Sequence, residues 1–97
     1  MATFVVLFNW TEQGIKSYKD SPSRVDQANE AWQDLGVRVK EIYWTIGPYD
    51  LVAIVEAPDP EALASGLLRL GALGNVRSTT MRALDRAEAE AVIAMAG

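Results

Sequence analysis

The stretch TFVVLFNW, residues 3–10, decides the fold because it is apolar on both of the faces that a β-strand presents. Phe4 and Val6 would face one side of a sheet, and Val5 and Leu7 would face the other. A continuous run of this kind is typical of a strand inside a sheet rather than of a strand at its edge. We therefore expect residues 3–10 to form a central strand.

A helix is predicted after this strand. Ser21-Pro22 supplies a capping hydroxyl and a proline at the first helical position, and Gly36 suits the left-handed residue that ends a helix. Residues 15–20 are ambiguous, and a loop with one helical turn fits them best. The apolar face of the helix is formed by Val25, Ala28, Ala31, Trp32 and Leu35.

Two neighbouring strands come next. Residues 37–46 alternate in polarity, and residues 51–56 follow after the tight connection Gly47-Pro48-Tyr49-Asp50, so the two strands should be antiparallel neighbours. In the first of them we expect one face to carry Val37, Val39 and Tyr43 and the other to carry Arg38, Lys40, Ile42 and Trp44. The pattern does not say whether Tyr43 or Trp44 lies under the helices.

The second half of the chain repeats this order. Asp59-Pro60 begins a helix whose apolar stripe is Leu63, Gly66, Leu67 and Leu70. Residues 71–75 form a breaker-rich turn, and residues 76–84 form a fourth strand. Asp85 and Glu88 then have the spacing of a capping box, which predicts a last helix carrying Val92 and Met95.

These elements predict a single α+β domain over residues 1–97, with the order β-α-β-β-α-β and a C-terminal helix. Right-handed crossovers give the ferredoxin-like fold, an antiparallel four-stranded sheet of order 4-1-3-2 with both helices on one face. The first strand is apolar on both faces, yet helices cover only one. We therefore expect the open face to be buried against a second copy in a homodimer.

The composition excludes several classes of function. The chain has neither cysteine nor histidine, so it lacks a thiolate nucleophile, a disulfide framework and the commonest metal ligands. We expect no cofactor and no metal. The net charge of −4 argues against binding nucleic acid. No apolar run is long enough to cross a bilayer, so we expect a cytoplasmic protein without membrane contact.

The segment YWTIGPYDLV, residues 43–52, resembles the signature of the GYD family of small dimeric α+β barrel proteins. Three other stretches lie where that family has similar segments: residues 21–24, 56–59 and 73–80. The wider superfamily implied by the resemblance includes cofactor-free monooxygenases, lactone isomerases, haem-containing chlorite dismutase-like proteins and effector-binding domains of Lrp-type regulators. Kinship of fold does not choose among them.

Six side chains are candidates for binding a ligand: Asn9, Trp10, Tyr43, Tyr49, Asp50 and Arg77. Tyr49 and Asp50 should lie beside the end of the first strand, where they either form a rigid corner or hold a polar ligand group. Asn9 either caps the next turn or joins Trp10, itself a core candidate, in a site. Arg77 either belongs to a solvated edge strand or pairs with a carboxylate or enolate, and Arg24 has the same alternatives.

Three functions fit this sequence. The first is a dimeric module that binds a small aromatic or carboxylate-bearing molecule in an apolar pocket with a few convergent polar groups, either between the sheet and the helices or at the end of the dimer barrel. The second is a cofactor-independent monooxygenase or isomerase, in which Tyr49 or Arg77 stabilises an enolate and Asn9 or Trp10 orients it. The third is a protein-interaction module.

Overall fold

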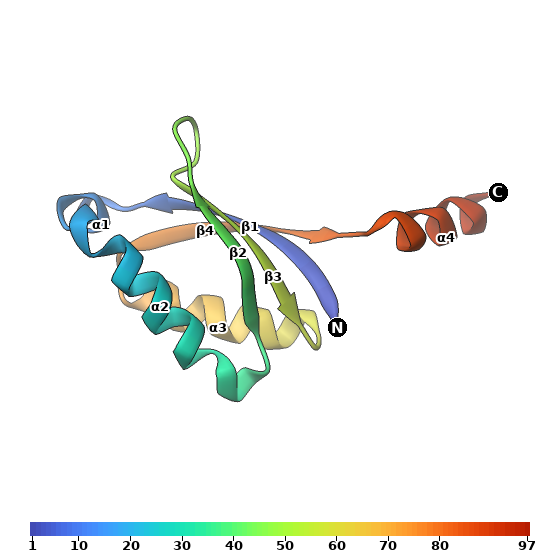
Figure 1. Cartoon of the computed structure of the whole chain (residues 1–97), viewed down its shortest axis with the longest axis horizontal. Coiled ribbons are helices and arrows are strands. Elements are labelled where there is room, and N and C mark those ends of the chain that lie inside the picture. The colour runs from blue at the N-terminus through green and yellow to red at the C-terminus, as the bar shows by residue number, and fades with distance from the viewer.

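The computed structural model describes all 97 residues and contains the predicted elements in the predicted order (Figure 1). The strands are β1 (Ala2–Trp10), β2 (Arg38–Trp44), β3 (Leu51–Ala57) and β4 (Val76–Ala83). The α-helices are α1 (Glu12–Lys16), α2 (Ser21–Ala31), α3 (Pro60–Ala72) and α4 (Arg86–Ala96), and 3₁₀ turns span Tyr18–Asp20 and Gln33–Leu35. None of these helices has the length and apolar content that crossing a bilayer requires.

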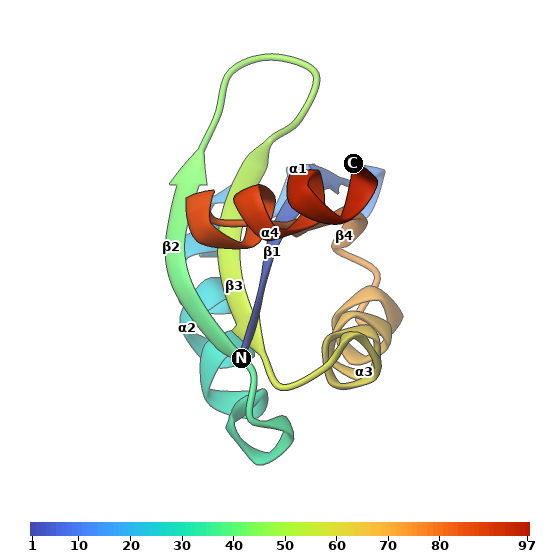
Figure 2. The same ribbon diagram turned by 90° about the vertical axis from the view of Figure 1, so that its right-hand side faces the viewer.

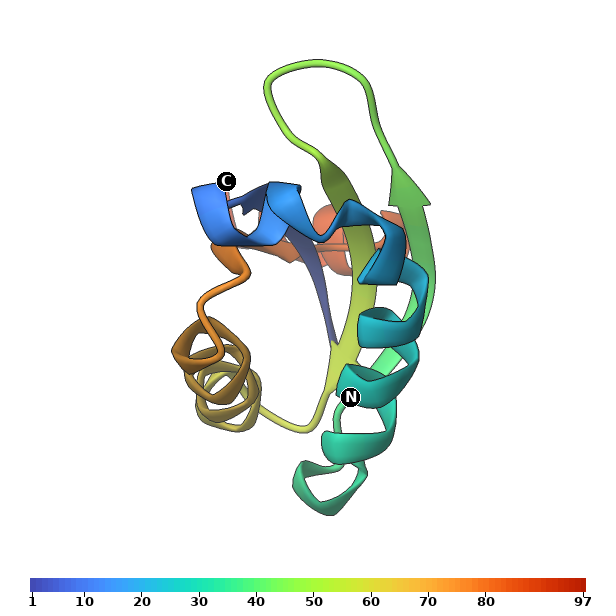
Figure 3. The same cartoon turned by 90° about the vertical axis from the view of Figure 1, so that its left-hand side faces the viewer.

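The four strands form one antiparallel sheet in the order β2-β3-β1-β4, which confirms the predicted order 4-1-3-2. The apolar strand β1 lies inside the sheet, between β3 and β4. The two long helices α2 and α3 cover the same face of the sheet, as Figure 3 shows. The predicted ferredoxin-like α+β fold is therefore confirmed.

The core fills the space between this sheet and its two helices. Its strand residues come from every second position of β1 and β3, in keeping with the two-residue period of a strand. Ten buried side chains form it: Phe4, Val6, Phe8, Trp32, Val37, Leu51, Ala53, Val55, Ala57 and Leu63. The alternate positions of β1 and β3 face away from the helices and are half-buried, except for Asn9, which is exposed.

Trp32 holds α2 and α3 together at one end. Its indole is 2% exposed, and its Nε1 donates a hydrogen bond of 3.1 Å to the carbonyl of Gly66. The absence of a side chain at Gly66 makes this approach possible, because a Cβ there would lie 2.8 Å from Trp32 Nε1. Beside it Arg69 donates to both carboxylate oxygens of Asp34, at 3.0 and 3.1 Å.

The predicted faces of β2 are wrong beyond Val39. A bulge between Val39 and Glu41 shifts the register, because one extra residue reverses the alternation that follows it. Val39 and Ile42, which simple alternation places on opposite faces, therefore both face the helices. Tyr43 pairs with Val52 on the open face, and Trp44 lies on the helix side.

The predicted helix beginning at Ser21-Pro22 needs two corrections. Ser21 does not cap α2; its hydroxyl instead accepts a hydrogen bond of 3.0 Å from Trp44 Nε1. The α-helix ends at Ala31 rather than Leu35, because the chain tightens into a 3₁₀ turn before Gly36, which has the predicted left-handed conformation (φ 71°).

Three other boundaries also differ from the prediction. Strand β2 stops at Trp44 instead of residue 46. Helix α3 continues to Ala72, through the glycine that was expected to end it. The short helix α1 begins at Glu12, before the ambiguous residues 15–20, which contain its end and the first 3₁₀ turn. It is capped by Thr11 rather than by Asn9: the Thr11 side chain accepts from Gly14 N at 3.0 Å.

Helix α4 projects away from the rest of the molecule (Figure 1), and it is the element nearest the viewer in Figure 2, in front of the sheet. The predicted capping box is present, with Glu88 N donating to Asp85 Oδ1 at 2.8 Å and Asp85 N donating to Glu88 Oε1 at 3.0 Å. Arg82 of β4 also contacts Glu88, at 2.9 Å. The Asp85 backbone N–H, followed by the Arg82 guanidinium, lowers the pKa of Glu88. The start of α4 is thus fixed, and its remainder packs on nothing in the chain.

Two glycine substitutions in α3 test the contact between the helices. Gly66→Ala places a methyl group against the Trp32 indole and should destabilise the protein by about 1–3 kcal/mol, the usual cost of overpacking. Gly71→Ala in the same helix meets nothing within 4 Å and should be neutral or stabilise by up to about 1 kcal/mol. Urea unfolding followed by circular dichroism measures both; equal effects would contradict the proposed close approach.

Candidate functional site

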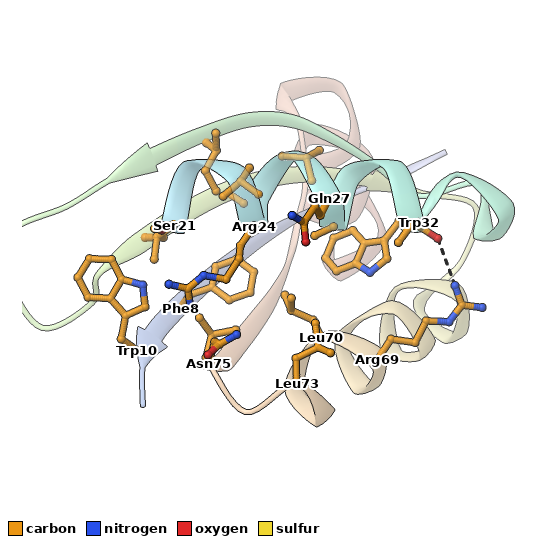
Figure 4. Close-up of a pocket in the computed structure, with 18 residues that line it drawn as sticks. Phe8, Trp10, Ser21, Arg24, Gln27, Trp32, Arg69, Leu70, Leu73 and Asn75 are labelled. Carbon is orange, nitrogen blue, oxygen red and sulfur yellow. Dashed lines mark hydrogen bonds between the residues drawn. The ribbon is translucent and has the colours of Figure 1, made fainter. Parts of the chain in front are cut away.

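A cavity of about 550 Å³ lies between the sheet and the two helices α2 and α3. Thirteen of its eighteen lining side chains are hydrophobic, so the space suits an apolar ligand. Its aromatic walls are the rings of Phe8, Trp10 and Trp32. Figure 4 shows Trp10 at one end of the cavity, with Arg24 and Asn75 beside it, and Trp32 and Leu70 further along.

The cavity exists because α2 and α3 touch at one end only. Trp32 and Gly66 draw the end of α2 onto the middle of α3. Towards the start of α2 the helices lie apart, as Figure 3 shows, and the small side chains of Ala28 and Ala31 line the space rather than filling it. The opening between the helices is therefore a consequence of where the chain places its large and small residues.

Arg24 carries the cavity's unpaired positive charge. Its Nη2 donates to the backbone carbonyl of Ser17 and, at 3.2 Å, to the Ser17 hydroxyl. Its Nε is shielded from solvent and has no hydrogen-bond partner. No carboxylate forms a salt bridge with it. A half-buried guanidinium in this state is unusual, because buried polar groups almost always find a partner.

Arg69 also lines the cavity but is neutralised. Its guanidinium is engaged by Asp34 and by the carbonyl of Ala31, to which Nη1 donates at 3.2 Å. The hydrogen bond from Arg69 lowers the pKa of Asp34, and the same pair raises the pKa of Arg69. Arg69 therefore strengthens the contact between α3 and the end of α2. Because its charge is matched by Asp34, it attracts an anionic ligand less than Arg24 does.

The end of the cavity near Asn75 is supported by α1 and the turn between α3 and β4. Thr11 N donates to the carbonyl of Asn75 at 3.0 Å, and Gln13 Nε2 donates to the Asn75 side-chain oxygen at 2.9 Å. Gly14 is buried against the same turn, where a Cβ would lie 1.9 Å from the Asn75 carbonyl oxygen. These contacts fix the position of Asn75 opposite Arg24.

Tyr49 and Asp50 do lie beside the end of β1, as the sequence indicated. Asp50 N donates to the carbonyl of Phe8 at 2.8 Å, and Asp50 Oδ2 accepts from Trp10 N at 2.9 Å. Thr45 completes the corner, with its hydroxyl donating to the Tyr49 carbonyl at 2.6 Å. The Asp50 carboxylate thus ties the loop between β2 and β3 to β1.

The remaining candidates are divided between the two faces of the sheet. Trp10 lines the cavity, whereas Asn9 and Arg77 are register partners on the open face, at the end of β1. Tyr43 is also on the open face, but it lies on β2, the opposite edge strand from the β4 of Arg77. A hydrogen bond of 2.5 Å to Glu41, together with the negative charge of that carboxylate, raises the pKa of Tyr43.

The candidates therefore do not converge on one site, and the unpaired charge in the cavity lining belongs to Arg24, at the Trp10 end. Sequence reasoning gave Arg24 only a passing role. The available signal was its spacing: it lies four residues before Ala28 and eight before Trp32, on the apolar face of the helix, where a charged side chain is unexpected. No group of three or more carboxylates is placed to hold a metal ion.

Comparison with known proteins identifies the family. The profile of the GYD domain matches residues 4–93, nearly the whole chain. The chain belongs to the GYD domain family. A relative from Thermus thermophilus, named glutamine synthetase and cystathionine beta-lyase binding protein, is 38% identical to this GYD domain over 89 residues, which cover 91% of this chain and 94% of the relative.

Two solved structures resemble this GYD domain. The crystal structure of TTHA0845 from Thermus thermophilus has a TM-score of 0.55 and 32% sequence identity, covering 87% of this chain and 94% of that one. The crystal structure of FFRP-DM1 has a TM-score of 0.61 and covers 87% of this chain and all of that one. At 21% identity the second likeness concerns the fold alone.

Substitutions in the loop between β2 and β3 test whether Asp50 stabilises the fold and whether the hydroxyl of Tyr49 does. Asp50→Ala removes the acceptor of Trp10 N and should lower the free energy of unfolding by about 1.5–3 kcal/mol, the usual range for a hydrogen bond to a charged group. Tyr49→Phe removes a hydroxyl with no hydrogen bond and should leave it unchanged. Urea unfolding followed by tryptophan fluorescence measures the difference; a stable Asp50→Ala protein would refute the structural role.

Proposed function

We propose that this GYD domain is a homodimeric protein-binding module. The observation that carries the proposal is the extent of apolar surface that one chain leaves uncovered, on the open face of the sheet and along α4. Apolar surfaces of this extent are typical of protein interfaces.

The open face has an apolar centre and a polar margin. One row across the sheet runs through Tyr43, Val52 and Leu7, which are register neighbours on β2, β3 and β1, and ends at the polar Thr79 on β4. The next row runs through Ile54, Val5 and Met81 on β3, β1 and β4, and its end on β2 is Glu41. At the margin lie the ion pair of Arg38 and Glu56 (2.8 Å) and the pair Asn9 and Arg77. Protein interfaces have this arrangement of apolar core and polar rim.

A second copy is the occupant that this face fits best. In a two-fold dimer the same patch is used twice, so each apolar row would pack on apolar side chains of the other copy. Four strands of about seven residues cover roughly 450 Å² in plan, which is less than the about 800 Å² that each partner buries in a standard interface. Further surface is needed, and α4 supplies it.

Helix α4 carries an apolar stripe that its own chain does not cover. Ala89, Val92, Ile93 and Ala96 follow the helical spacing, and Val92 and Ile93 are 49% and 69% exposed. An isolated helix of about eleven residues is only marginally stable in water. Because Arg82 and Glu88 anchor α4 beside the end of β4, the stripe can extend the sheet interface onto the second copy.

The kind of partner beyond the dimer is suggested by the Thermus relative. Its name describes a protein that binds two enzymes, glutamine synthetase and cystathionine beta-lyase. We propose that this GYD domain likewise binds an enzyme of this kind. The 38% identity over 91% of the chain supports the transfer of role within the family.

Small-molecule binding is a second candidate function, which the cavity under α2 and α3 favours. It is compatible with protein binding, because the cavity and the open face lie on opposite sides of the sheet. The enzyme alternative has less support: Trp10 is separated by the sheet from Asn9, Arg77 and Tyr43, so these side chains do not surround one reacting group.

A charge in the centre of the open face tests the dimer. Light scattering coupled to gel filtration should find the wild type dimeric and Val52→Glu monomeric, because the substitution would bury a carboxylate without a partner. Leu68→Glu, on the exposed side of α3, is the matched control and should remain dimeric. Circular dichroism checks that both variants are folded. A monomeric wild type, or a folded Val52→Glu dimer, contradicts the proposal.

The enzyme partner can be tested with purified components. Glutamine synthetase and cystathionine beta-lyase from the source organism of this chain are each mixed with the GYD domain and analysed by gel filtration. We expect co-elution with at least one of them. Removal of residues 86–97 should weaken co-elution, because the proposed binding unit is the dimer and α4 supplies part of the dimer interface. Absence of co-elution with either enzyme would remove the proposed partner class while leaving the dimer untouched.

A further inference from the structure

We infer that the cavity between α2, α3 and the sheet binds a monocarboxylate with an aromatic body, and that Arg24 is the partner of its carboxylate. This inference rests on the second candidate function, small-molecule binding, and adds to it the site and the chemical class of the ligand. It is independent of the dimer and of the enzyme partner.

The first argument is the charge of the cavity. None of its eighteen lining residues is an aspartate or a glutamate. Of the two arginines among them, Arg69 is matched by Asp34, whereas Arg24 has no acidic partner. An apolar cavity with one unmatched cation favours an apolar ligand with one negative charge, because removing the guanidinium from water is unfavourable until an anion is placed beside it.

The second argument is the unfilled hydrogen-bonding capacity of Arg24. Its Nη2 is held by Ser17, so the side chain is already positioned without a ligand. Its Nε has neither water access nor a partner, which is unfavourable for the protein alone. A small movement of the guanidinium towards a carboxylate would give this Nε–H an acceptor, and charge-assisted bonds of this type are among the strongest that side chains make.

The third argument is the shape of the remaining space. Figure 4 shows the Arg24 guanidinium near Trp10 and Asn75, and the Trp32 ring further along the cavity. The carboxylate would therefore lie at the Trp10 end and the body of the ligand would extend towards Trp32. Because Trp32 Nε1 already donates to Gly66, this indole offers the ligand an apolar ring rather than a hydrogen bond. A phosphate ester, with its second charge, would find no second free cation here.

Two probes of matched shape test the charge requirement. The probes are 2-naphthylacetate and the neutral 2-naphthylacetamide, and titration calorimetry at pH 7 measures their binding to the wild type. For ligands of about 14 non-hydrogen atoms, we expect the carboxylate to bind with a Kd of about 1 mM or tighter. The amide should bind about 10-fold to 100-fold more weakly, as expected on loss of a charged hydrogen bond.

Matched arginine variants then assign the charge to one residue. Arg24→Gln should abolish the preference for the carboxylate while binding of the amide is retained, and Arg24→Lys should keep part of the preference. Lys19→Gln is the control, because this exposed positive charge does not line the cavity, and it should keep the full preference. Ala28→Trp should fill the cavity and abolish binding of both probes. Thermal unfolding of each variant verifies that it is folded.

The outcomes separate this inference from the function on which it rests. If neither probe binds the wild type, small-molecule binding by this cavity fails, and the inference fails with it. If both probes bind the wild type equally, the role of Arg24 is overturned while small-molecule binding stands. The same follows if a folded Arg24→Gln protein keeps the preference for the carboxylate, or if a folded Arg24→Lys protein loses it entirely. Unchanged binding by Ala28→Trp would place the site elsewhere and also overturn the inference.

Discussion

The close approach of Trp32 to Gly66 is the contact on which the arrangement of the helices depends. The large indole at the end of α2 can approach α3 this closely only where α3 has no side chain, and this requirement fixes the point at which the two helices meet. Beyond that point the helices diverge, and the residues of α2 are too small to fill the space. The buried contact and the cavity beside it are therefore two results of the same constraint, and a change at Gly66 would alter both.

The ends of the strands are fixed by hydrogen bonds that join distant parts of the chain. Asp50 connects the loop between β2 and β3 to β1, and Thr11 connects the start of α1 to the turn before β4. Both connections lie next to Trp10 and Asn75, which border the cavity. Two separate connections therefore fix Trp10 and Asn75 at this end of the cavity. Arg24, on the facing helix α2, is held by Ser17, so its position is defined before any ligand binds.

The sequence predicted the fold well because periodicity and capping residues are local signals. The two-sided apolarity of β1, the left-handed Gly36 and the capping box of Asp85 were all predicted correctly. The faces of β2 were not, because one bulged residue after Val39 reverses them and nothing in the composition announces it. An apolar pocket was predicted, but the place of Arg24 in it was missed for a different reason: the missing partner of Arg24 Nε depends on how α2 lies against the sheet, which is a tertiary property.

Helix α4 has a consequence for the lifetime of the protein in a cell. It is joined to the domain at its first turn and supported by nothing else in the chain, so it is the segment expected to open first. Exposed, weakly held segments are preferred sites for proteolytic cleavage. A copy whose α4 is covered would be spared, while an unassembled copy would be degraded. The amount of the protein would then follow the amount of whatever covers α4, without a dedicated regulator.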